Sequence, residues 1–463
     1  MPSIPAIGEF TVCEINRELL TTKDESDTQA KDAYAKILGL VFPPISFQIE
    51  EGFGSASRQQ FDQDLDREDT IVTPSTSEGT NALQEGGLLL KGVSVLKNIL
   101  ASSFGPIFSP NDTKVLKKVE LLQGISWHRH KHILAFISGS NQVTVHDFQD
   151  PEWRESSLLV SESQRGIEAL EWRPNGGTTL SVACRGGICI WSASYPGSVA
   201  PVRSGVASFL GTSTRGSSVR WTLVDFLQIP GGKAVTALSW SPTGRLLASA
   251  SREDSSFTIW DVAQGVGTPL RRGLGGISLL KWSPTGDYLF SAKPNGTFYL
   301  WETNTWTLEQ WSSSGGCVIS ATWGPDGRML FMAFSESTTL GSLHFAGRPP
   351  SLDAHLLPME LPEIGSITGG FGNIEKMAWD GCGERLAVSY TGGDLMYVGL
   401  IAIYDTRRTP FISASLVGFI RGPGEQVKPL AFAFHDKFKQ GPLLSVCWSS
   451  GLCCTYPLIF RAH

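Results

Sequence analysis

Three features of the sequence predict an all-β fold, a seven-bladed WD40 β-propeller with a partly helical, partly disordered N-terminal extension. A unit of about 40 residues occurs twice in succession between residues 234 and 302. Each copy places a tryptophan before a turn, and each copy ends on a tryptophan followed by an acid. One such unit cannot bury both of its faces, so we expect it to be a member of a closed ring.

The first copy shows how the residues dictate the strands. Residues 234–240 alternate apolar and polar side chains, which is typical of a half-buried strand. The Ser-Pro-Thr-Gly turn at 241–244 supplies the dihedral angles of a tight reversal, and an aliphatic second strand follows it. The third strand closes on Trp260 and Asp261, and residues 276–302 repeat the whole pattern.

An aromatic residue at the end of the first strand recurs along the rest of the chain. Successive aromatic residues are 45, 68, 42, 41, 56 and 55 positions apart, so the longer intervals must contain loops. We expect these loops within 192–233, 348–373 and 406–426, at a rim or blade edge that partners can reach. The seven predicted blade anchors are Trp127, Trp172, Trp240, Trp282, Trp323, Trp379 and Phe434.

Composition divides the chain into four parts. Residues 1–50 are expected to hold a closing strand and a short helix, and residues 51–87 read as a flexible acidic linker. Residues 88–118 are predicted to form an amphipathic helix and its connector. The seven-bladed propeller is assigned to residues 119–463.

Ring closure requires a strand from outside the last blade, because the chain ends almost directly after the final repeat. The alternating segment 10–16 is one source of this strand, and residues 115–122 are the other. The sequence does not choose between them.

The apolar stripe of the predicted helix is a candidate partner-binding surface. Leu89, Val93, Leu96 and Leu100 recur at helical spacing. Two interpretations compete: the helix packs against the side of the propeller, or it offers its apolar face to a partner or a membrane surface.

Charge and cysteine usage limit the partners and the compartment. The net charge is −6, but residues 1–85 contain 16 acidic and 6 basic residues, which leaves the remainder at +4. A near-neutral propeller argues against direct nucleic-acid binding. The eight cysteines show no Cys-x-x-Cys spacing, and the N-terminus lacks the features of a signal peptide. We therefore expect a reducing compartment, and no membrane span is predicted.

Motifs that would carry chemistry are weak. His128, His130 and His132 alternate as metal ligands on a strand would, but Arg129 and Lys131 between them oppose a bound cation. An exposed turn is the preferred interpretation of this segment. The sequence has no nucleophile elbow and no zinc-binding helix, so we expect no catalytic, cofactor-binding or metal residues and no enzymatic activity.

The repeats resemble one particular group of WD-repeat proteins, the aladin family of nucleoporins. The similarity covers most of residues 124–458 and is densest in 235–250, 279–306 and 434–458, the last of which is not a generic WD40 sequence. Residues 11–19 also look like the opening segment of this family. The region before the propeller looks shorter and less helical than in animal members, which favours a plant-like or other non-animal member.

This resemblance implies a non-enzymatic scaffold component of the nuclear pore complex at the nuclear envelope. The implied partners are other nucleoporins, including a transmembrane nucleoporin of the pore membrane, and the implied role is support of nucleocytoplasmic protein transport. No cofactor is implied.

Two other functions compete with this one. A WD40 adaptor of another assembly, such as a ubiquitin ligase substrate receptor or a chromatin reader, would need a ligase-binding motif or an exposed aromatic cage. A propeller hydrolase would place acids or histidines around the axial channel, where the sequence leads us to expect mostly glycine, alanine and small apolar residues.

Overall fold

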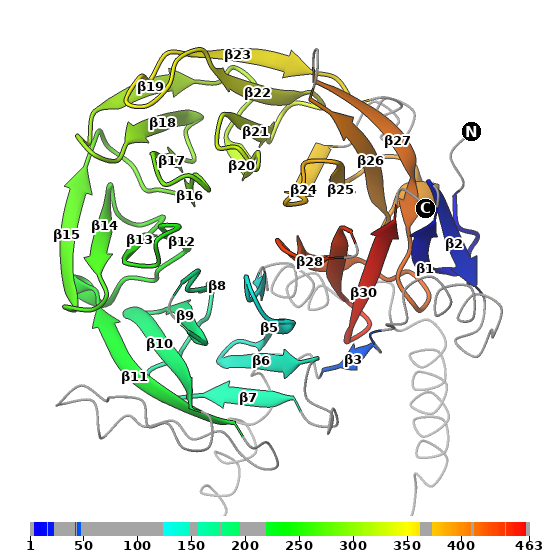
Figure 1. Ribbon diagram of the computed structural model, residues 1–463, viewed down its shortest axis with the longest axis horizontal. Coiled ribbons are helices and arrows are strands. Elements are labelled where there is room, and N and C mark those ends of the chain that lie inside the picture. Colours follow the sequence, from blue (N-terminus) through cyan, green and yellow to red (C-terminus); the bar gives the residue numbers. More distant parts are fainter. Residues whose placement is uncertain are drawn as a thin grey trace, which may run out of the picture. The chain divides into compact units, whose positions relative to one another are not determined.

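Seven β-sheets follow one another around a common axis and form a closed ring (Figure 1). The all-β class and the seven blades predicted from the repeats are thereby confirmed. The predicted linker and the helix with Leu89, Val93, Leu96 and Leu100 lie outside the described residues. The computed structural model describes residues 4–15, 17–22, 42, 44–47, 124–148, 156–175, 177–194, 219–361, 373–408, 412–439 and 441–459.

Each of the first six blades is an antiparallel sheet of four strands that are hydrogen-bonded in chain order. Blade 1 contains β4 (Ile125–Trp127), β5 (Ile133–Gly139), β6 (Gln142–Asp147) and β7 (Ser157–Val160). Blade 2 contains β8 (Ala169–Trp172), β9 (Thr179–Cys184), β10 (Gly187–Ser194) and β11 (Arg220–Gln228). Blade 3 contains β12 (Ala237–Trp240), β13 (Leu246–Ala250), β14 (Ser256–Asp261) and β15 (Val266–Arg271).

The remaining blades continue the same order. Blade 4 contains β16 (Leu279–Trp282), β17 (Tyr288–Ala292), β18 (Thr297–Glu302) and β19 (Leu308–Ser312). Blade 5 contains β20 (Val318–Trp323), β21 (Met329–Phe334), β22 (Leu340–Phe345) and β23 (Ala354–Met359). Blade 6 contains β24 (Asn373–Trp379), β25 (Arg385–Thr391), β26 (Ile401–Arg407) and β27 (Ser413–Ile420). Blade 7 contains β28 (Pro429–Phe434), β29 (Leu443–Trp448) and β30 (Leu452–Ile459).

One cross-strand pair recurs in every blade. The aromatic residue that ends the first strand lies opposite a leucine of the second strand, and all seven leucines are fully buried. Apolar cross-strand pairs of this kind fix the register of neighbouring strands. The seven pairs are Trp127–Leu134, Trp172–Leu180, Trp240–Leu247, Trp282–Leu289, Trp323–Leu330, Trp379–Leu386 and Phe434–Leu444.

The turn that follows this pair requires glycine. Gly244 has a φ of 70° and its backbone N–H donates to Ser241 O at 2.8 Å, which closes a tight reversal. A side chain is strained in this left-handed conformation, whereas glycine adopts it readily, so the Ser-Pro-Thr-Gly motif ends on glycine. Gly286 repeats the same turn in the next blade, with a φ of 89° and a hydrogen bond to Ser283 O.

The longer intervals between anchors contain outer strands as well as loops. The expectation that 406–426 loops out is wrong for β27, which pairs with β26 as the fourth strand of blade 6. Likewise β11 lies within 192–233 and β23 within 348–373. These outer strands are partly exposed, and they contain residues that are uncommon in strand interiors, such as Pro358 of β23 and Gly418 of β27, so they are not recognised as strands from the sequence.

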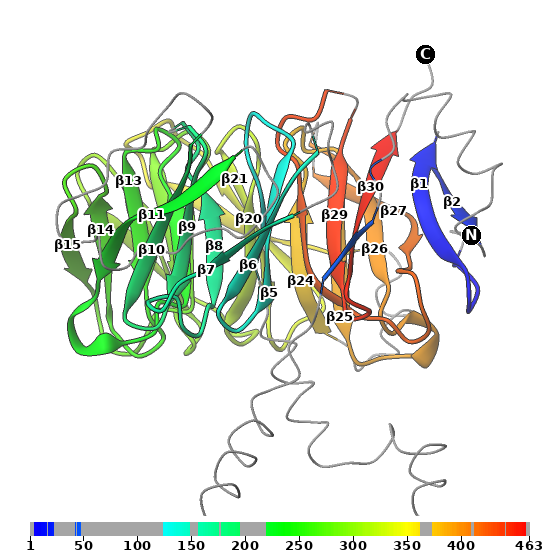
Figure 2. The same ribbon diagram turned by 90° about the horizontal axis from the view of Figure 1, so that it is seen from below.

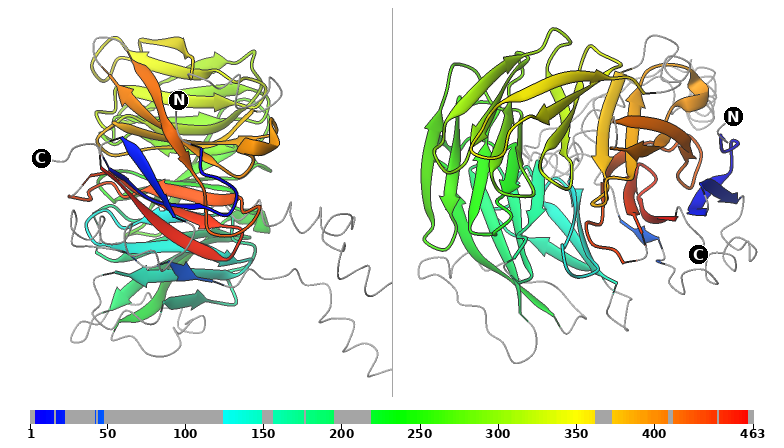
Figure 3. Two further views of the ribbon diagram at one scale, coloured as in Figure 1. Left: turned by 90° about the vertical axis from the view of Figure 1, so that its right-hand side faces the viewer. Right: turned by 45° about the horizontal axis from the view of Figure 1, so that its top comes forward.

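The N-terminal segment completes blade 7. Strand β1 (Phe10–Ile15) runs parallel to β30, with Glu14 opposite Leu458, and β2 (Glu18–Thr22) pairs with β1. Strand β3 (Ile45–Ser46) pairs antiparallel with the other end of β30. Figures 2 and 3 show β1, in blue, beside the red strand of the last blade. Of the two segments expected to close the ring, 10–16 therefore supplies this strand, and 115–122 lies outside the described residues.

The described part of the chain contains no helix that could cross a lipid bilayer. Its helical elements are single 3₁₀ turns, η2 (Pro230–Gly232) and η3 (Leu395–Tyr397).

Candidate functional site

An axial channel of about 450 Å³ runs between the first strands of the blades, and all seven blades contribute to its wall. The expectation of mostly glycine, alanine and small apolar residues here is wrong, because the lining contains both acids and bases. A channel that admits water tolerates such charges, whereas a dry core would not. The charged lining residues are Glu168, Glu171, Arg252, Lys281, Lys376 and Asp436.

Glu171 of β8 is a carboxyl of the channel whose pKa is shifted upward. Burial raises the pKa of its carboxyl to about 7, and the charge of Lys281 opposes this rise. Perturbed carboxyls in cavities are frequent at functional sites, since they exchange protons near neutral pH. This carboxyl also accepts a hydrogen bond from the backbone N–H of Trp240 at 3.3 Å, which joins blade 2 to blade 3.

The histidine segment packs against the next blade. His128 is buried, stacks edge-on against Trp172, and accepts the backbone N–H groups of His130 and Lys131 on Nδ1 at 3.1 Å each. The expectation of an exposed turn is therefore wrong for His128, because its ring packs against the indole of the next blade. Within the described ranges, no three or more His, Cys, Asp or Glu side chains are grouped so that they could hold a metal ion.

Four of the predicted anchors connect neighbouring blades through their indole N–H groups. Each indole donates a hydrogen bond to the blade that precedes its own, and the first of these bonds joins blade 1 to blade 7. Buried indole N–H groups need hydrogen-bond partners, and here the partner lies on the preceding blade, so the same tryptophan packs within its own blade and links it to its neighbour. The pairs are Trp127 with Ser445 Oγ at 3.1 Å, Trp172 with Ser126 O, Trp240 with Ser181 Oγ and Trp323 with Lys281 O, the last three at 3.0 Å.

The other anchors lie at the same strand ends with different partners. Trp282 is buried and donates to Gly286 O at 3.1 Å in its own turn, and Trp379 donates to Thr406 Oγ1 at 3.0 Å in its own blade. Phe434 is buried in the core of the last blades. Trp323 differs from the other tryptophan anchors because it remains partly exposed.

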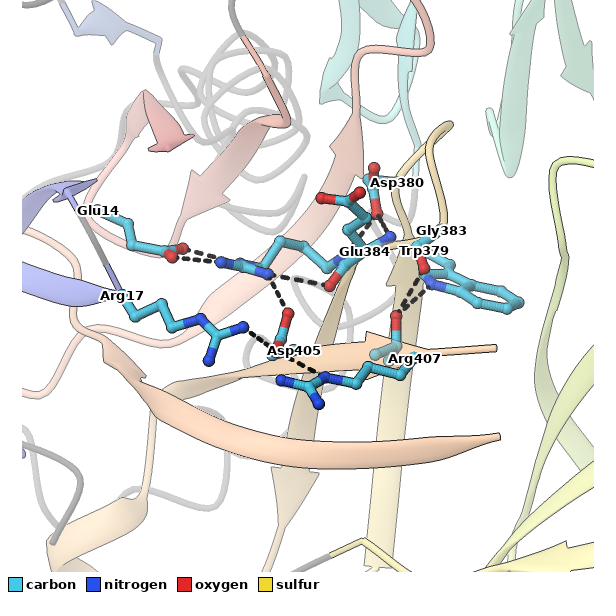
Figure 4. Close-up of polar contacts among 10 residues, drawn as sticks. Glu14, Arg17, Trp379, Asp380, Gly383, Glu384, Asp405 and Arg407 are labelled. Atoms are coloured by element: carbon cyan, nitrogen blue, oxygen red, sulfur yellow. Dashed lines mark hydrogen bonds and ion pairs between the residues drawn. The ribbon is translucent and has the colours of Figure 1, made fainter. Parts of the chain in front are cut away.

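A buried ion network connects the N-terminal strand to blade 6 (Figure 4). Arg385 donates from Nη2 to Glu14 Oε1 at 2.6 Å and from Nε to Glu14 Oε2 at 3.0 Å. Its Nη1 donates to Asp405 Oδ1 at 2.6 Å. Arg17 reaches the other oxygen of Asp405 at 2.9 Å. We call Glu14, Arg385 and Asp405 the closure triad.

The closure triad lies almost entirely out of water. The side chains of Glu14 and Arg385 are 0% exposed and that of Asp405 is 10% exposed. Burial alone would lower the pKa of Arg385, but the hydrogen bond and charge of Glu14, together with Asp405, raise it. The guanidinium therefore stays charged, and carboxylates on two different segments accept its hydrogen bonds.

Sequence reasoning missed the closure triad. Glu14 and Arg385 are separated by 371 residues, and neither belongs to a recognisable motif. The one signal for it was the alternation of residues 10–16, which predicted a strand but gave no partner for Glu14.

Comparisons with known proteins extend over the whole ring. A family model described as the Aladin seven-bladed propeller matches residues 115–459. A protein from Arabidopsis thaliana named Aladin is 59% identical over 470 residues, which covers 100% of this chain and 99% of that protein.

Solved structures share the fold at low sequence identity. The β-propeller domain of Myceliophteria thermophila Cps50 (Swd1) aligns with a TM-score of 0.53 and 15% identity, over 72% of this chain and 95% of that chain. A chain of the Mitotic Checkpoint Complex aligns with a TM-score of 0.50 and 14% identity, over 73% and 90%. These two likenesses show the propeller architecture alone.

The match to the plant protein includes the N-terminal region as well as the repeats. The resemblance seen in the repeats is therefore one of the full chain, and generic WD40 spacing does not account for it. The chain belongs to the aladin family.

Proposed function

We propose that this chain is a non-enzymatic scaffold component of the nuclear pore complex. It binds other nucleoporins at the nuclear envelope, including a transmembrane nucleoporin of the pore membrane, and it supports nucleocytoplasmic transport of proteins. It makes no direct contact with nucleic acid and uses no cofactor. The observation that carries this proposal is membership of a nucleoporin-type scaffold family along the full length of the chain.

The way the buried polar groups are used supports a scaffold. The closure triad and the indoles of Trp127 and Trp240 all connect one blade or strand to another. Glu171, the channel carboxyl with the perturbed pKa, accepts a hydrogen bond across a blade boundary as well. A ring fixed in this way presents its loops in constant positions, which is what a platform for several partners requires.

Affinity capture from detergent-solubilised nuclear envelopes tests this proposal. The tagged full chain is compared with a variant that lacks residues 51–105, identified proteins being quantified by mass spectrometry. The deletion starts at 51 because β1, β2 and β3 complete the last blade and must be kept. We expect the full chain to enrich nucleoporins, including one that spans the membrane.

The deletion variant separates the two attachment surfaces. Retained nucleoporins would place attachment on the propeller, and their loss would place it on the segment with Leu89, Val93, Leu96 and Leu100. Enrichment of ubiquitin ligase subunits or histones in place of nucleoporins would contradict the proposed function.

A further inference from the structure

The connection between blades 3 and 4 exposes a large apolar side chain. Leu274 lies between β15 and β16, and 81% of its surface is accessible to solvent. Single exposed leucines are common on protein surfaces, so exposure by itself indicates no function. The backbone that carries Leu274 is what distinguishes this position.

A buried lysine donates hydrogen bonds to the backbone of this loop. Lys293 is 3% exposed, and its Nζ donates to Arg272 O at 2.6 Å and to Leu274 O at 2.9 Å. A Cβ on Gly276 would lie 1.7 Å from Arg252 O, so the loop also packs directly on the backbone of blade 3. Leu274 is thus presented on a fixed support, and a side chain ordered in advance loses little entropy on binding.

The surroundings of Leu274 are positively charged. Arg252, Arg271 and Arg272 are exposed, and in the part of the chain that the structure describes no ion pair joins any of them to a carboxylate. The ammonium of Lys293 adds a further positive charge beneath the loop. We call Arg252, Arg271, Arg272 and Leu274 the Leu274 surface.

The charge of Glu168 interacts with that of Arg252, but in the described part of the chain no carboxylate forms an ion pair with Arg271 or Arg272. Asp254 is paired with Lys233 at 2.9 Å, and Glu253 is exposed. Arg252 also lines the axial channel, so the Leu274 surface reaches from the outer strand β15 to the channel mouth. An extended peptide could therefore meet several arginines and the leucine at once.

We propose that the Leu274 surface binds an acidic peptide segment of a partner protein that carries a large apolar side chain. This inference rests on the proposed function and gives the chemistry of one partner. The arginines complement carboxylates and set the approach of the peptide, and Leu274 provides a central apolar contact. Nucleic acid would satisfy the arginines but would leave the fixed leucine without a role.

Fluorescence anisotropy on the full chain tests this surface. The probe is a short labelled peptide with several aspartates and two leucines. Two control peptides replace the leucines by serine or the aspartates by asparagine, and a labelled single-stranded RNA is measured alongside. Binding of the probe should weaken about tenfold or more for R271Q/R272Q and for L274S, as for residues at the centre of an interface.

Two matched variants control for nonspecific effects. V266S removes an exposed apolar side chain from the other end of β15, where Val266 is 56% exposed, and K437Q/K439Q removes two exposed positive charges from another loop. Both should change the dissociation constant less than twofold. Binding should also weaken with rising salt concentration, because the arginine contacts are exposed and screened.

Several results would overturn the inference. They are no binding of the probe, equal binding of the serine peptide, unchanged binding by L274S, or RNA binding that is tighter than peptide binding and independent of Leu274. Captured nucleoporins together with no peptide binding would reject this surface and keep the proposed function. Peptide binding without captured nucleoporins would keep this surface and reject the proposed function.

Discussion

Glu14 of β1 and Arg385 of β25 are joined by two hydrogen bonds, although 371 residues separate them in the sequence. Both side chains are fully buried, so the pair is shielded from water and salt. The strand that closes the ring is therefore held to blade 6 by charge as well as to β30 by its backbone. A buried pair of this kind adds little net stability but makes the loss of either partner costly.

Glu14→Gln should lower the free energy of unfolding by about 1.5–3 kcal/mol, because an amide replaces the carboxylate that accepts two charge-assisted hydrogen bonds from the buried Arg385 guanidinium. Urea denaturation measures the effect. Arg17→Gln is the matched control, since the side chain of Arg17 is 53% exposed where it meets Asp405. It should cost less than about 1 kcal/mol. Equal losses for the two variants would show that the closure triad does not hold β1.

Trp282→Ala should cost about 3–5 kcal/mol, because it opens a cavity opposite the fully buried Leu289. Trp323→Ala makes the same chemical change at a partly exposed anchor and should cost clearly less. Thermal unfolding of both variants checks the order. A Trp282 variant that melts within a degree or two of the parent would contradict its role as a blade anchor.

Acidification should destabilise the seam between blades 1 and 7 through His435. Burial lowers the pKa of this imidazole to about 4, helped by the charge of His132, whose Nδ1 is hydrogen-bonded to His435 Nε2 at 3.2 Å. The folded state favours the neutral ring, so the contribution of His435 to the free energy of unfolding is fully present above pH 6.5. Up to about 3 kcal/mol is lost as the pH falls from there through 4.

Denaturation at several pH values checks this effect. His435→Asn should flatten the loss of stability between pH 6.5 and 4, whatever its effect at pH 7. His130→Gln changes an exposed histidine of the neighbouring segment and should leave the slope unaltered. A slope that is the same in all three proteins would exclude His435 as its source.

Glu171 should give the opposite pH dependence, because its contribution to the stability of the fold falls as the pH rises. Burial raises its pKa to about 7, so the folded state favours the neutral acid. The associated stability is complete below the ordinary pKa of the carboxyl and is lost as the pH rises through 7. Glu171→Gln should therefore stabilise the protein by about 1–2 kcal/mol at pH 8 and have little effect at pH 4. This value is smaller than the full pKa shift implies, because the side chain is partly exposed and solvent screens its charge. Exposed Glu309→Gln should change stability equally at both pH values.

Local features of the fold could be predicted from the sequence because their partners lie close together in the chain. Trp240 and Gly244 are four residues apart, and together they specify a strand end and its turn. The charged residues of the channel could not be predicted, because Glu171 and Lys281 line the same channel from different blades. The closure triad was equally hidden, because only the folded ring brings Glu14 to Arg385.

The outer strands of the blades could not be predicted from the sequence either. β27 has one partner strand and is partly exposed over its first five residues, whereas β12 is buried at every position. Interval lengths between anchors therefore revealed that extra residues exist but did not show which of them pair. The anchors themselves carried more information, because each ends the first strand of its blade.

The position of the protein in the cell tests the central claim most directly. Fluorescence imaging of the tagged full chain, expressed at its natural level in cells with a marked pore membrane, should show a punctate ring at the nuclear envelope that coincides with the marker. A diffuse cytosolic or nucleoplasmic signal would contradict the assignment of this chain as a nuclear pore scaffold.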